Sequence, residues 1–256
     1  MLLDKTIAVV VPAYNEAKQI DRVLRTMPNF VDRIIVVNDC STDNTADVVL
    51  SYIKEDRAIG KVITQAHAKT EENQYDRAER LLKEKQQDDM RHYIPSEIAN
   101  TYPDTDRVIL INHLKNGGVG AAIARGYKWC LDHKIDCTAV MAGDGQMDPS
   151  ELEKICKPVL SEDIDYVKGN RLIHGSARLI IPKIRFFGNS MLSILTKIAS
   201  GYWHVSDTQS GYTAISLAAL NAIKIHDIYR SYGMPNDMLV KLNIAFCTIK
   251  EIKIKP

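Results

Sequence analysis

Short apolar runs recur along the chain, and most of them are followed by a stretch with helical periodicity. The runs lie at residues 7–11, 34–37, 108–111, 137–141 and 164–168. An apolar run of this length is typical of a strand that is buried on both faces of a parallel sheet. The alternation of strand and helix predicts right-handed βαβ units. We therefore expect an α/β fold with a Rossmann-like, mostly parallel sheet flanked by helices.

Spacing and capping residues mark the helices between these strands. Apolar residues recur at helical spacing from Ile20, and a second helix is expected to end near Tyr52. Ser41 or Thr42 is the expected cap at the amino end of that second helix. Asp148 is expected to cap the helix that follows the run at 137–141.

One long stretch interrupts the rhythm of strand and helix. Residues 65–106 are rich in charged and amide side chains and contain few large apolar residues. We expect a charged surface insertion here, with a short strand at 61–64 before it and a solvated helix at 75–87 within it. The chain as a whole, residues 1–256, is expected to form a single domain that contains this insertion.

A second stretch, residues 178–200, mixes apolar side chains with arginines and lysines. Two interpretations stay open: a helix that covers the core, or an amphipathic segment that lies in a membrane interface with its cations at the headgroups. No apolar run approaches the ~20 residues that a membrane span requires. Alternation over residues 247–254 predicts a final strand, which suggests a chain that continues beyond Pro256.

Composition and charge exclude several classes of function. The chain is 45% apolar and 25% charged, and its net charge of +1 gives no general case for a nucleic-acid partner. Its five cysteines show neither paired nor metal-binding spacing, which suits a reducing, cytoplasmic compartment. The amino end does not resemble a signal peptide. The chain lacks the serine-hydrolase elbow and the zinc-protease motif.

Polar side chains gather where the apolar runs end. The carboxyl ends of parallel strands share one sheet edge, which is where open α/β folds bind ligands. Carboxylates with few histidine or cysteine neighbours suit a hard cation such as Mg²⁺ or Mn²⁺. The residues expected at this edge are Tyr14, Glu16, Asp39, Asp144, Gln146, Arg171, Asp207 and Asp237.

The segment Asn-Gly-Gly-Val-Gly at residues 116–120 has two interpretations. Its glycines would cradle a phosphate at a helix amino end, or they would form a tight turn before a helix of small residues packed closely on the sheet. The spacing matches neither a Walker loop nor a dinucleotide fingerprint, so the sequence leaves both interpretations open.

Four motifs, in order at strand ends, resemble the inverting family 2 glycosyltransferases with a GT-A fold. They read Val-Pro-Ala-Tyr-Asn-Glu at 11–16, Val-Asn-Asp-Cys-Ser-Thr-Asp at 37–43, Asn-Gly-Gly-Val-Gly-Ala-Ala at 116–122 and Gly-Asp-Gly-Gln-Met-Asp-Pro at 143–149. Within that family the chain is most similar to the dolichyl- and polyprenyl-phosphate mannose synthase group. The resemblance implies transfer of a sugar from a UDP- or GDP-linked donor to a polyprenyl or dolichyl phosphate, at the cytoplasmic face of a membrane.

The resemblance also implies roles for individual residues. The nucleoside would be held by Pro12, Tyr14, Glu16, Asp39 and Asn116. A divalent cation, Mg²⁺ or Mn²⁺, would be held by Asp144 and Gln146. The acceptor phosphate would be bound by Arg171 together with Arg178 or Arg185. The catalytic centre would comprise Asp144, Arg171, Asp207 and Asp237.

Physical chemistry bears on the kind of acceptor. A hydroxyl acceptor needs a general base, whereas a phosphate acceptor is already an anion and needs cations to bind it. Arginine suits phosphate especially well. Arg171 and the basic, apolar stretch at 178–200 therefore favour a lipid phosphate. A glycan or protein hydroxyl acceptor remains the alternative.

The chain departs from the family pattern at two positions. Ala142 stands where the first acid of an Asp-x-Asp pair is usual, and Asn38 replaces the first of two consecutive acids. With a single carboxylate at the metal, the diphosphate and water would supply more of the coordination shell. These departures also leave open a non-catalytic module that binds a nucleotide sugar.

Overall fold

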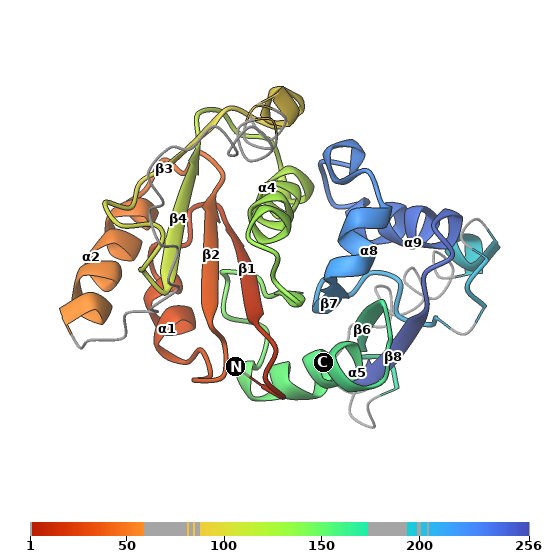
Figure 1. Cartoon of the computed structure of the whole chain (residues 1–256). Coiled ribbons are helices and arrows are strands. Elements are labelled where there is room, and N and C mark those ends of the chain that lie inside the picture. Colours follow the sequence, from red (N-terminus) through yellow and green to blue (C-terminus); the bar gives the residue numbers. More distant parts are fainter. Residues whose placement is uncertain are drawn as a thin grey trace.

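A single mixed sheet organises the chain. The structure is a computed structural model, and it describes residues 2–58, 81, 84, 88–173, 194–198, 201–203 and 205–255. Within these residues, an 8-stranded sheet has the order β3-β4-β2-β1-β5-β7-β6-β8 (Figure 1). The strands are β1 Ile7–Ala13, β2 Arg33–Asn38, β3 Ser96–Ile98, β4 Val108–His113, β5 Cys137–Val140, β6 Tyr166–Asn170, β7 Thr213–Ser216 and β8 Ile249–Lys253.

All of these strands except β3 and β7 run in one direction. β1 pairs in parallel with β2 and β5, β2 with β4, and β6 with β8. β7 is antiparallel to both of its neighbours, β5 and β6, and β3 is antiparallel to β4. The expected mostly parallel α/β sheet is confirmed, and the carboxyl ends of the parallel strands lie at one edge.

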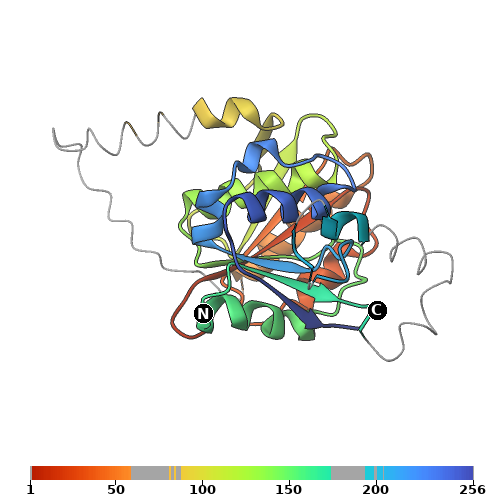
Figure 2. The ribbon, with the colours of Figure 1, turned by 90° about the vertical axis from the view of Figure 1, so that its right-hand side faces the viewer.

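Helices cover both faces of the sheet. One face carries α1 (Ile20–Arg25), α2 (Thr45–Ala58) and α5 (Leu152–Ser161). The other carries α4 (Val119–Asp132), α8 (Leu217–Ala222) and α9 (Met234–Ile244). Short 3₁₀ turns lie at η2 Met90–His92, η3 Pro149–Glu151 and η4 Ile225–Asp227. Figure 2 shows α5 on one side of the sheet and α8 and α9 on the other.

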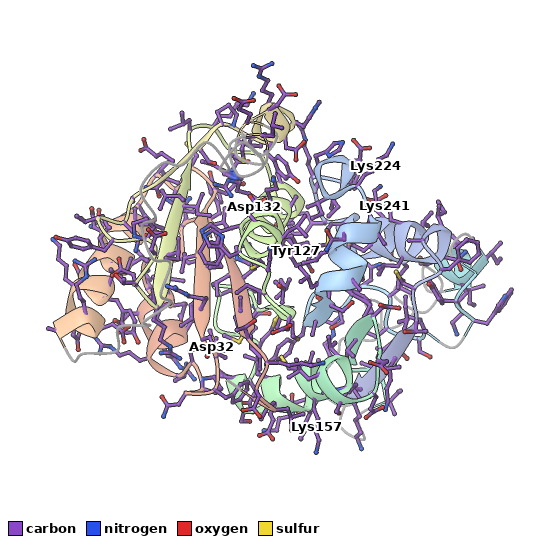
Figure 3. The ribbon with its side chains drawn as sticks, viewed as in Figure 1. Asp32, Tyr127, Asp132, Lys157, Lys224 and Lys241 are labelled. Atoms are coloured by element: carbon purple, nitrogen blue, oxygen red, sulfur yellow. The ribbon has the colours of Figure 1, made fainter. Side chains whose placement is uncertain are left out.

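The two-sided cover explains the continuous apolar runs. In β1, Val9 and Val11 pack in the cluster with α1 and α5, whereas Ala8 and Val10 pack in the cluster with α4. Because both faces are buried, successive residues are all apolar and no alternation appears. Tyr127 of α4 is fully buried in the second cluster, which reaches α8 and α9 (Figure 3).

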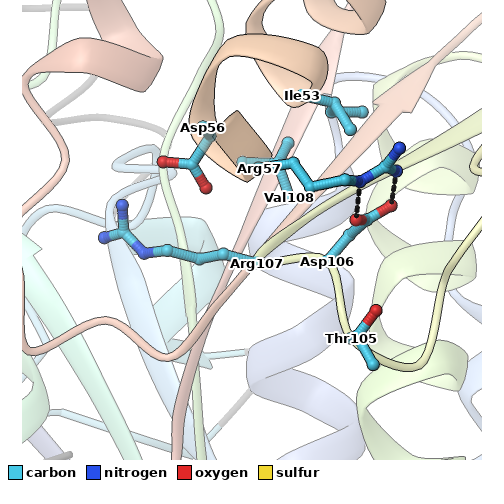
Figure 4. A pocket seen from close by; sticks show the side chains of 7 residues that line it. All are labelled: Ile53, Asp56, Arg57, Thr105, Asp106, Arg107 and Val108. Atoms are coloured by element: carbon cyan, nitrogen blue, oxygen red, sulfur yellow. Dashed lines mark hydrogen bonds and ion pairs between the residues drawn. The ribbon is translucent and has the colours of Figure 1, made fainter. Parts of the chain in front are cut away.

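The opposite edge of the sheet, at the amino end of β4, is closed by charged side chains. Arg57, at the end of α2, donates through Nε and Nη2 to the two carboxylate oxygens of Asp106, at 2.9 and 2.8 Å (Figure 4). Arg107 donates to the main-chain oxygens of Val31 and Pro28. The hollow among these groups measures only about 10 Å³. It is too small for a ligand, so this edge serves the fold.

The boundary of the expected insertion needs a correction. The insertion was expected over 65–106, but residues 96–98 form β3 and pair with β4 at the edge of the sheet. Ile94 is also buried and lies against Gly117. The chain therefore rejoins the core earlier than its polar composition indicates, because an edge strand needs few apolar residues. The expected strand at 61–64 and nearly all of the expected helix at 75–87 lie outside the described residues.

The expected cap of α2 was wrong. The helix begins at Thr45, and the carboxylate of Asp43 accepts a hydrogen bond from the Thr45 main-chain N–H at 3.0 Å. Ser41 and Thr42 instead bind Asn15 in the loop after β1. The expected cap of the later helix is confirmed, since Asp148 accepts from Ser150 N–H. In the described part of the chain, no helix combines the length and hydropathy that a membrane crossing requires.

Candidate active site at the carboxyl edge

A cavity of about 480 Å³ opens at the carboxyl edge, beside the ends of β1, β2 and β5. Its volume lies in the range of sites that hold cofactors and nucleotides. Residues from five separate parts of the sequence line it. Those expected from the sequence are Pro12, Tyr14, Glu16, Asp39, Asn116 and Asp144.

The loop after β1 is fixed by the loop after β2. The main-chain N–H groups of Asn15 and Glu16 donate to the hydroxyls of Ser41 and Thr45, both at 2.9 Å. Asn15 adopts a left-handed conformation with φ 58°, which asparagine tolerates, and its side chain accepts from Thr42 N–H at 2.8 Å. These bonds hold Tyr14 and Glu16 at the cavity.

Asp39 is the most constrained side chain of the site. Its Oδ1 faces His113 Nδ1 at 2.6 Å and accepts from Gly117 N–H at 2.8 Å, and its Oδ2 accepts from Gly118 N–H at 2.8 Å. Both Asp39 and His113 are buried. Two main-chain N–H donors and the imidazole of His113 hold this side chain in one orientation. Asp39 thus joins the end of β2 to the loop after β4.

Close packing explains the glycines of the 116–120 loop. A Cβ on Gly118 or Gly120 would lie 2.4 Å from the main-chain oxygen of Arg230 or 2.0 Å from that of Tyr229. Gly120 N–H donates to the oxygen of Arg230 at 2.8 Å, so a main-chain carbonyl occupies this donor at the amino end of α4. Gly126, further along α4, lies against Val10 of β1. The described contacts favour the tight turn with a closely packed helix over a phosphate cradle.

Asn38 has a role in the fold that an acid would not fill. Its Nδ2 donates to Asn112 Oδ1 at 2.9 Å, and its Oδ1 accepts from Ser41 N–H at 3.2 Å. An amide can donate on one side and accept on the other, which a carboxylate cannot do. The departure from the family pattern at this position therefore suits the neighbouring Asn112.

Asp144 and Glu16 bring two negative charges to the cavity. Burial, followed by the nearby charges of Asp144 and Asp43, raises the pKa of Glu16. Oδ1 of Asp144 accepts from Gln146 N–H at 3.0 Å, which fixes the turn after β5. Among the described residues, no three Asp, Glu, His or Cys side chains gather as a metal-binding group. A divalent cation would fit here with Asp144 as a ligand, provided that a diphosphate and water complete its shell.

Gln146 and Asp148 lie on the other side of this turn. Gln146 lines a separate hollow with Arg22 and Thr26 of the α1 region, and it is not among the residues that line the 480 Å³ cavity. Asp148 is bound by Lys255 Nζ at 2.6 Å as well as by Ser150, and these hydrogen bonds lower its pKa to about 2. Asp148 therefore belongs to the fold, while a metal-binding role for Gln146 stays a prediction.

Arg171 stands at the end of β6 and is gripped by Asp207. Its Nε and Nη2 donate to the two Asp207 oxygens at 2.9 and 3.1 Å, and its main-chain N–H donates at 3.0 Å. The Asp207 side chain is 1% exposed and that of Arg171 is 35% exposed. Burial acts to raise the pKa of Asp207, but Arg171 outweighs it and the pKa lies below its usual value. Asp207 is thus an ion-pair partner and a poor base.

Asp237 is likewise engaged with its neighbours. Its carboxylate accepts from Tyr229 N–H at 2.8 Å and pairs with Lys241 of α9 at 2.7 Å. It holds the segment that leads to Ser231 and Tyr232, which line the cavity. Arg171, Asp207 and Asp237 are not among the lining residues. Arg178 and Arg185 lie outside the described residues.

Several residues of the site escaped the sequence-based prediction. His113 follows a predicted strand by two residues, so its place at the edge was accessible to the same reasoning. Ser231 and Tyr232 carry no comparable signal, since they reach the cavity only through the packing of Tyr229 and Arg230 on distant glycines. Glu251, which binds the Asp207 loop, gives a weak signal as a charged residue within a predicted strand.

Comparison with known proteins identifies the family. The model of Glycosyl transferase family 2 matches residues 8–83 and 87–224. The chain belongs to this family. It is therefore a glycosyltransferase, and the expected resemblance is confirmed.

Two curated relatives show how this glycosyltransferase compares in sequence. A UDP-N-acetylglucosamine–dolichyl-phosphate N-acetylglucosaminyltransferase of Methanococcus voltae is 29% identical over 98% of this chain and 87% of its own length. An undecaprenyl-phosphate mannosyltransferase of Micrococcus luteus is 27% identical over 51% of this chain and 53% of its own length. Both relatives carry a polyprenyl-type phosphate in their names.

A solved structure shares the fold of this glycosyltransferase. Glucosyl-3-phosphoglycerate synthase of Mycobacterium tuberculosis, in complex with Mn²⁺, UDP and glucosyl-3-phosphoglycerate, has a TM-score of 0.58 at 17% identity. The match covers 98% of this chain and 71% of that one. The GT-A fold expected from the sequence is confirmed.

The contacts of Asp39 predict a large effect of removing its charge. Asp39→Asn places an amide N–H₂ against donors that now bind oxygen, so we expect a loss of about 2 to 4 kcal/mol in the free energy of unfolding. Urea denaturation measures this loss. Asp47→Asn, at an exposed position in the first turn of α2, is the control and should cost less than about 1 kcal/mol. Equal stability of Asp39→Asn and the wild type would contradict the anchoring role of this carboxylate.

Proposed function

We propose that this glycosyltransferase moves a sugar from a nucleotide sugar to a polyprenyl phosphate, at the cytoplasmic face of a membrane. The observation that carries the proposal is Arg171. It is a partly exposed guanidinium at the same sheet edge as the acidic cavity, and it is held in place by a buried carboxylate. An oriented arginine suits a phosphate monoester, which accepts paired N–H donors. The relatives from Methanococcus voltae and Micrococcus luteus support this acceptor class by name.

The donor would occupy the 480 Å³ cavity. Asp39 would face the base, with Pro12, Tyr14, Glu16 and Asn116 around the nucleoside, and the diphosphate would extend toward Asp144. Tyr14 and Tyr232 line this cavity while 48% and 87% exposed, so each can cover a planar base at little cost. A carboxylate oxygen of Asp39 would accept an N–H from the base, and uracil and guanine both offer one. UDP- and GDP-linked sugars both satisfy this requirement.

A divalent cation, Mg²⁺ or Mn²⁺, would be held by Asp144 together with the diphosphate. The cation supplies positive charge at the departing diphosphate. The two carboxylates of Glu16 and Asp144 are consistent with such a cation, because each otherwise faces the other's charge. Ala142 offers no second acid, so the donor contributes more ligands than is usual. The Mn²⁺ complex of the Mycobacterium tuberculosis synthase supports this assignment through the fold alone.

The acceptor assignment rests on the state of the candidate bases. A hydroxyl acceptor would require Asp207 or Asp237 to remove a proton. Asp207 is paired with Arg171, and Asp237 is paired with Lys241. Burial acts to raise the pKa of Asp207, but Arg171 holds that pKa below its usual value, so Asp207 is a weak base. The oxygens of Asp237 are already occupied by Lys241 Nζ and Tyr229 N–H. A phosphate acceptor arrives already ionised and asks of Asp207 only that it orient Arg171.

An exposed apolar patch supports docking to a membrane. Its members are Ile194, Leu195, Ile198, Trp203, Ile244 and Phe246, each more than half exposed. The short helix at 194–198 lies beside α9 (Figures 1 and 2), and Tyr202 Oη donates to the oxygen of Cys247 at 2.6 Å. Phe246 is 94% exposed and has φ 57°, a conformation that favours glycine. Large apolar side chains held in water in this way suit a lipid interface.

The free thiols support the proposed compartment. All five cysteines are free, and most are buried. Free cysteines persist in reducing compartments, which supports the cytoplasmic face.

A donor screen tests the proposed reaction. The protein is incubated with UDP- or GDP-linked sugars, Mg²⁺ or Mn²⁺ and polyprenyl phosphate, and both nucleoside diphosphate release and organic-extractable sugar are measured. We expect a lipid-linked product that disappears with EDTA. Asp144→Asn keeps the acceptor oxygen for Gln146 N–H but removes the charge, and it should lower turnover by about 10²-fold or more. Nucleoside diphosphate binding without turnover under every condition would instead favour a non-catalytic module.

A pair of variants separates the two acceptor classes. Arg171→Ala should lower kcat/KM for polyprenyl phosphate by about 10²-fold, because it removes the charge-assisted hydrogen bonds to the phosphate. Asp237→Asn keeps an oxygen for Tyr229 N–H and should retain most of the activity. Abolished turnover in Asp237→Asn with a mild effect of Arg171→Ala would point to a hydroxyl acceptor.

The apolar patch predicts binding to vesicles. Replacing both Trp203 and Phe246 by Ser removes two interfacial anchors, and we expect the fraction that sediments with polyprenyl-phosphate-containing vesicles to fall at least fivefold. Replacing Tyr102 and Leu114, which are also more than half exposed, provides the control. Sedimentation that is unchanged in the Trp203 and Phe246 variant would show that this patch does not contact the membrane.

A further inference from the structure

A largely buried charged cluster includes Arg171. It consists of Lys168 and Asn170 of β6, Arg171 just after β6, Asp207 in the segment before β7, and Glu251 of β8, and we call it the β6–β8 polar cluster. The side chains of Lys168 and Asn170 are fully buried, and Asp207 is nearly so. Buried charges are rare unless they pair and form hydrogen bonds. The hydrogen bonds of the cluster show which segments it positions.

Glu251 fixes the two segments that flank the Arg171–Asp207 pair. Its Oε1 accepts from the main-chain N–H groups of Ser206 and Asp207, at 2.8 and 3.0 Å. Its Oε2 accepts from Asn170 Nδ2 at 2.7 Å. The Glu251 carboxylate thus sets the position of Asp207 through the main chain and that of Asn170 through its side chain.

Asn170 in turn fixes the main chain of the residues after Arg171. Its Oδ1 accepts from Leu172 N–H and Ile173 N–H, at 2.9 and 3.1 Å. Hydrogen bonds to Asn170 therefore fix the turn that contains Arg171, and hydrogen bonds to Asp207 fix its guanidinium. The orientation of the Arg171 side chain depends on both sets of hydrogen bonds.

Lys168 supplies the second cation of the cluster. Its Nζ donates to the main-chain oxygen of Ser210 at 2.5 Å. Burial lowers its pKa to about 8, while the charges of Asp207 and Glu251 act to keep it protonated and Arg171 opposes them. Among the residues that the structure describes, these three charged groups are the ones that act on the Lys168 pKa. Near neutral pH the cluster then contains two cations and two carboxylates.

The charge of Lys168 changes what Arg171 can offer to a ligand. Without Lys168, Arg171 would face both carboxylates alone, and their negative charge would oppose an approaching phosphate. With Lys168 protonated, that negative charge is shared, and the 35% exposed guanidinium keeps a net attraction for an anion. This attraction is strong because the cluster lies in a medium of low dielectric constant.

We propose that Lys168 and Glu251 are positioning residues for the phosphate of the acceptor: Glu251 sets the geometry of Arg171, and Lys168 preserves its charge. The inference rests on the proposed function, since Arg171 is taken as the group that contacts the polyprenyl phosphate. Neither Lys168 nor Glu251 touches the substrate.

The test measures binding and turnover separately in the full chain. Calorimetry gives the affinity for a short prenyl phosphate and, independently, for UDP and GDP with Mg²⁺. The variants are Lys168→Met, which keeps the apolar stem, and Glu251→Gln, which places an N–H₂ against Asn170 or the loop N–H groups. The control is Glu162→Gln, which breaks the exposed ion pair between Glu162, just after α5, and Lys250 of β8, the strand that also carries Glu251. Thermal unfolding identifies any variant that fails to fold, in which case the other variant is used.

We expect the affinity for prenyl phosphate to fall roughly fivefold or more in both variants, with the nucleotide affinities unchanged. The pH profile gives a second readout. Above pH 7 a phosphate monoester is already a dianion, so its binding to the wild type should weaken as Lys168 loses its proton near pH 8. Binding to Lys168→Met should lack this inflection.

Wild-type affinity in both variants, or an equal loss of prenyl phosphate and nucleotide binding, would overturn the inference. An inflection near pH 8 that persists in Lys168→Met would also overturn it. The proposed function fails in a different way: prenyl phosphate binds and depends on Lys168, yet no lipid-linked sugar forms with any donor. Absence of prenyl phosphate binding to the wild type would refute both.

Discussion

The buried carboxylate of Asp39 is the contact on which the rest of the site depends. It accepts from two successive glycine N–H groups and faces His113, so the ends of β2 and β4 and the start of α4 meet at one anion. A buried carboxyl group without hydrogen-bond partners would be costly, and the two N–H donors and His113 provide those partners. The same contacts fix the glycine loop close to Tyr229 and Arg230, which brings Ser231 and Tyr232 to the cavity. One carboxylate thus organises residues from opposite ends of the chain.

The glycine loop shows how one pattern serves two physical purposes. A run of glycines before a helix is compatible with a bound phosphate, because main-chain N–H groups are then accessible. In this protein, the N–H groups of Gly117 and Gly118 bind Asp39, and that of Gly120 binds Arg230. The glycines are needed because a neighbouring main chain lies where a Cβ would stand. Sequence spacing alone does not distinguish these cases, since both require residues without side chains.

Local patterns carried the prediction a long way, and long-range packing set its limit. The apolar runs located the parallel strands. Of the eight residues expected at the carboxyl edge of the sheet, Tyr14, Glu16, Asp39 and Asp144 line one cavity, and the family resemblance added Pro12 and Asn116. The pairing of Arg171 with Asp207 was not accessible, because the residues are 36 positions apart and meet only through the antiparallel strand β7. The edge strand β3 was hidden within a polar segment for a similar reason: its stability comes from pairing with β4. The hydrogen bonds between Glu251 and the segment that contains Asp207 form because β8 pairs with β6. The periodicity of the sequence does not predict which strands pair.

The two ends of the site solve opposite electrostatic problems. At the donor end, Glu16 and Asp144 leave negative charge facing the cavity, which a divalent cation can balance when a diphosphate arrives. At the acceptor end, the carboxylate of Asp207 is buried against Arg171, and that of Glu251 is bound by main-chain N–H groups and Asn170, while the guanidinium of Arg171 is partly exposed. A sheet edge that presented free carboxylates at both ends would repel an anionic acceptor. Near Arg171 the acids are engaged in hydrogen bonds and ion pairs, which suits an anionic phosphate. At the cavity the carboxylates of Glu16 and Asp144 remain accessible, which suits a cation-bound diphosphate.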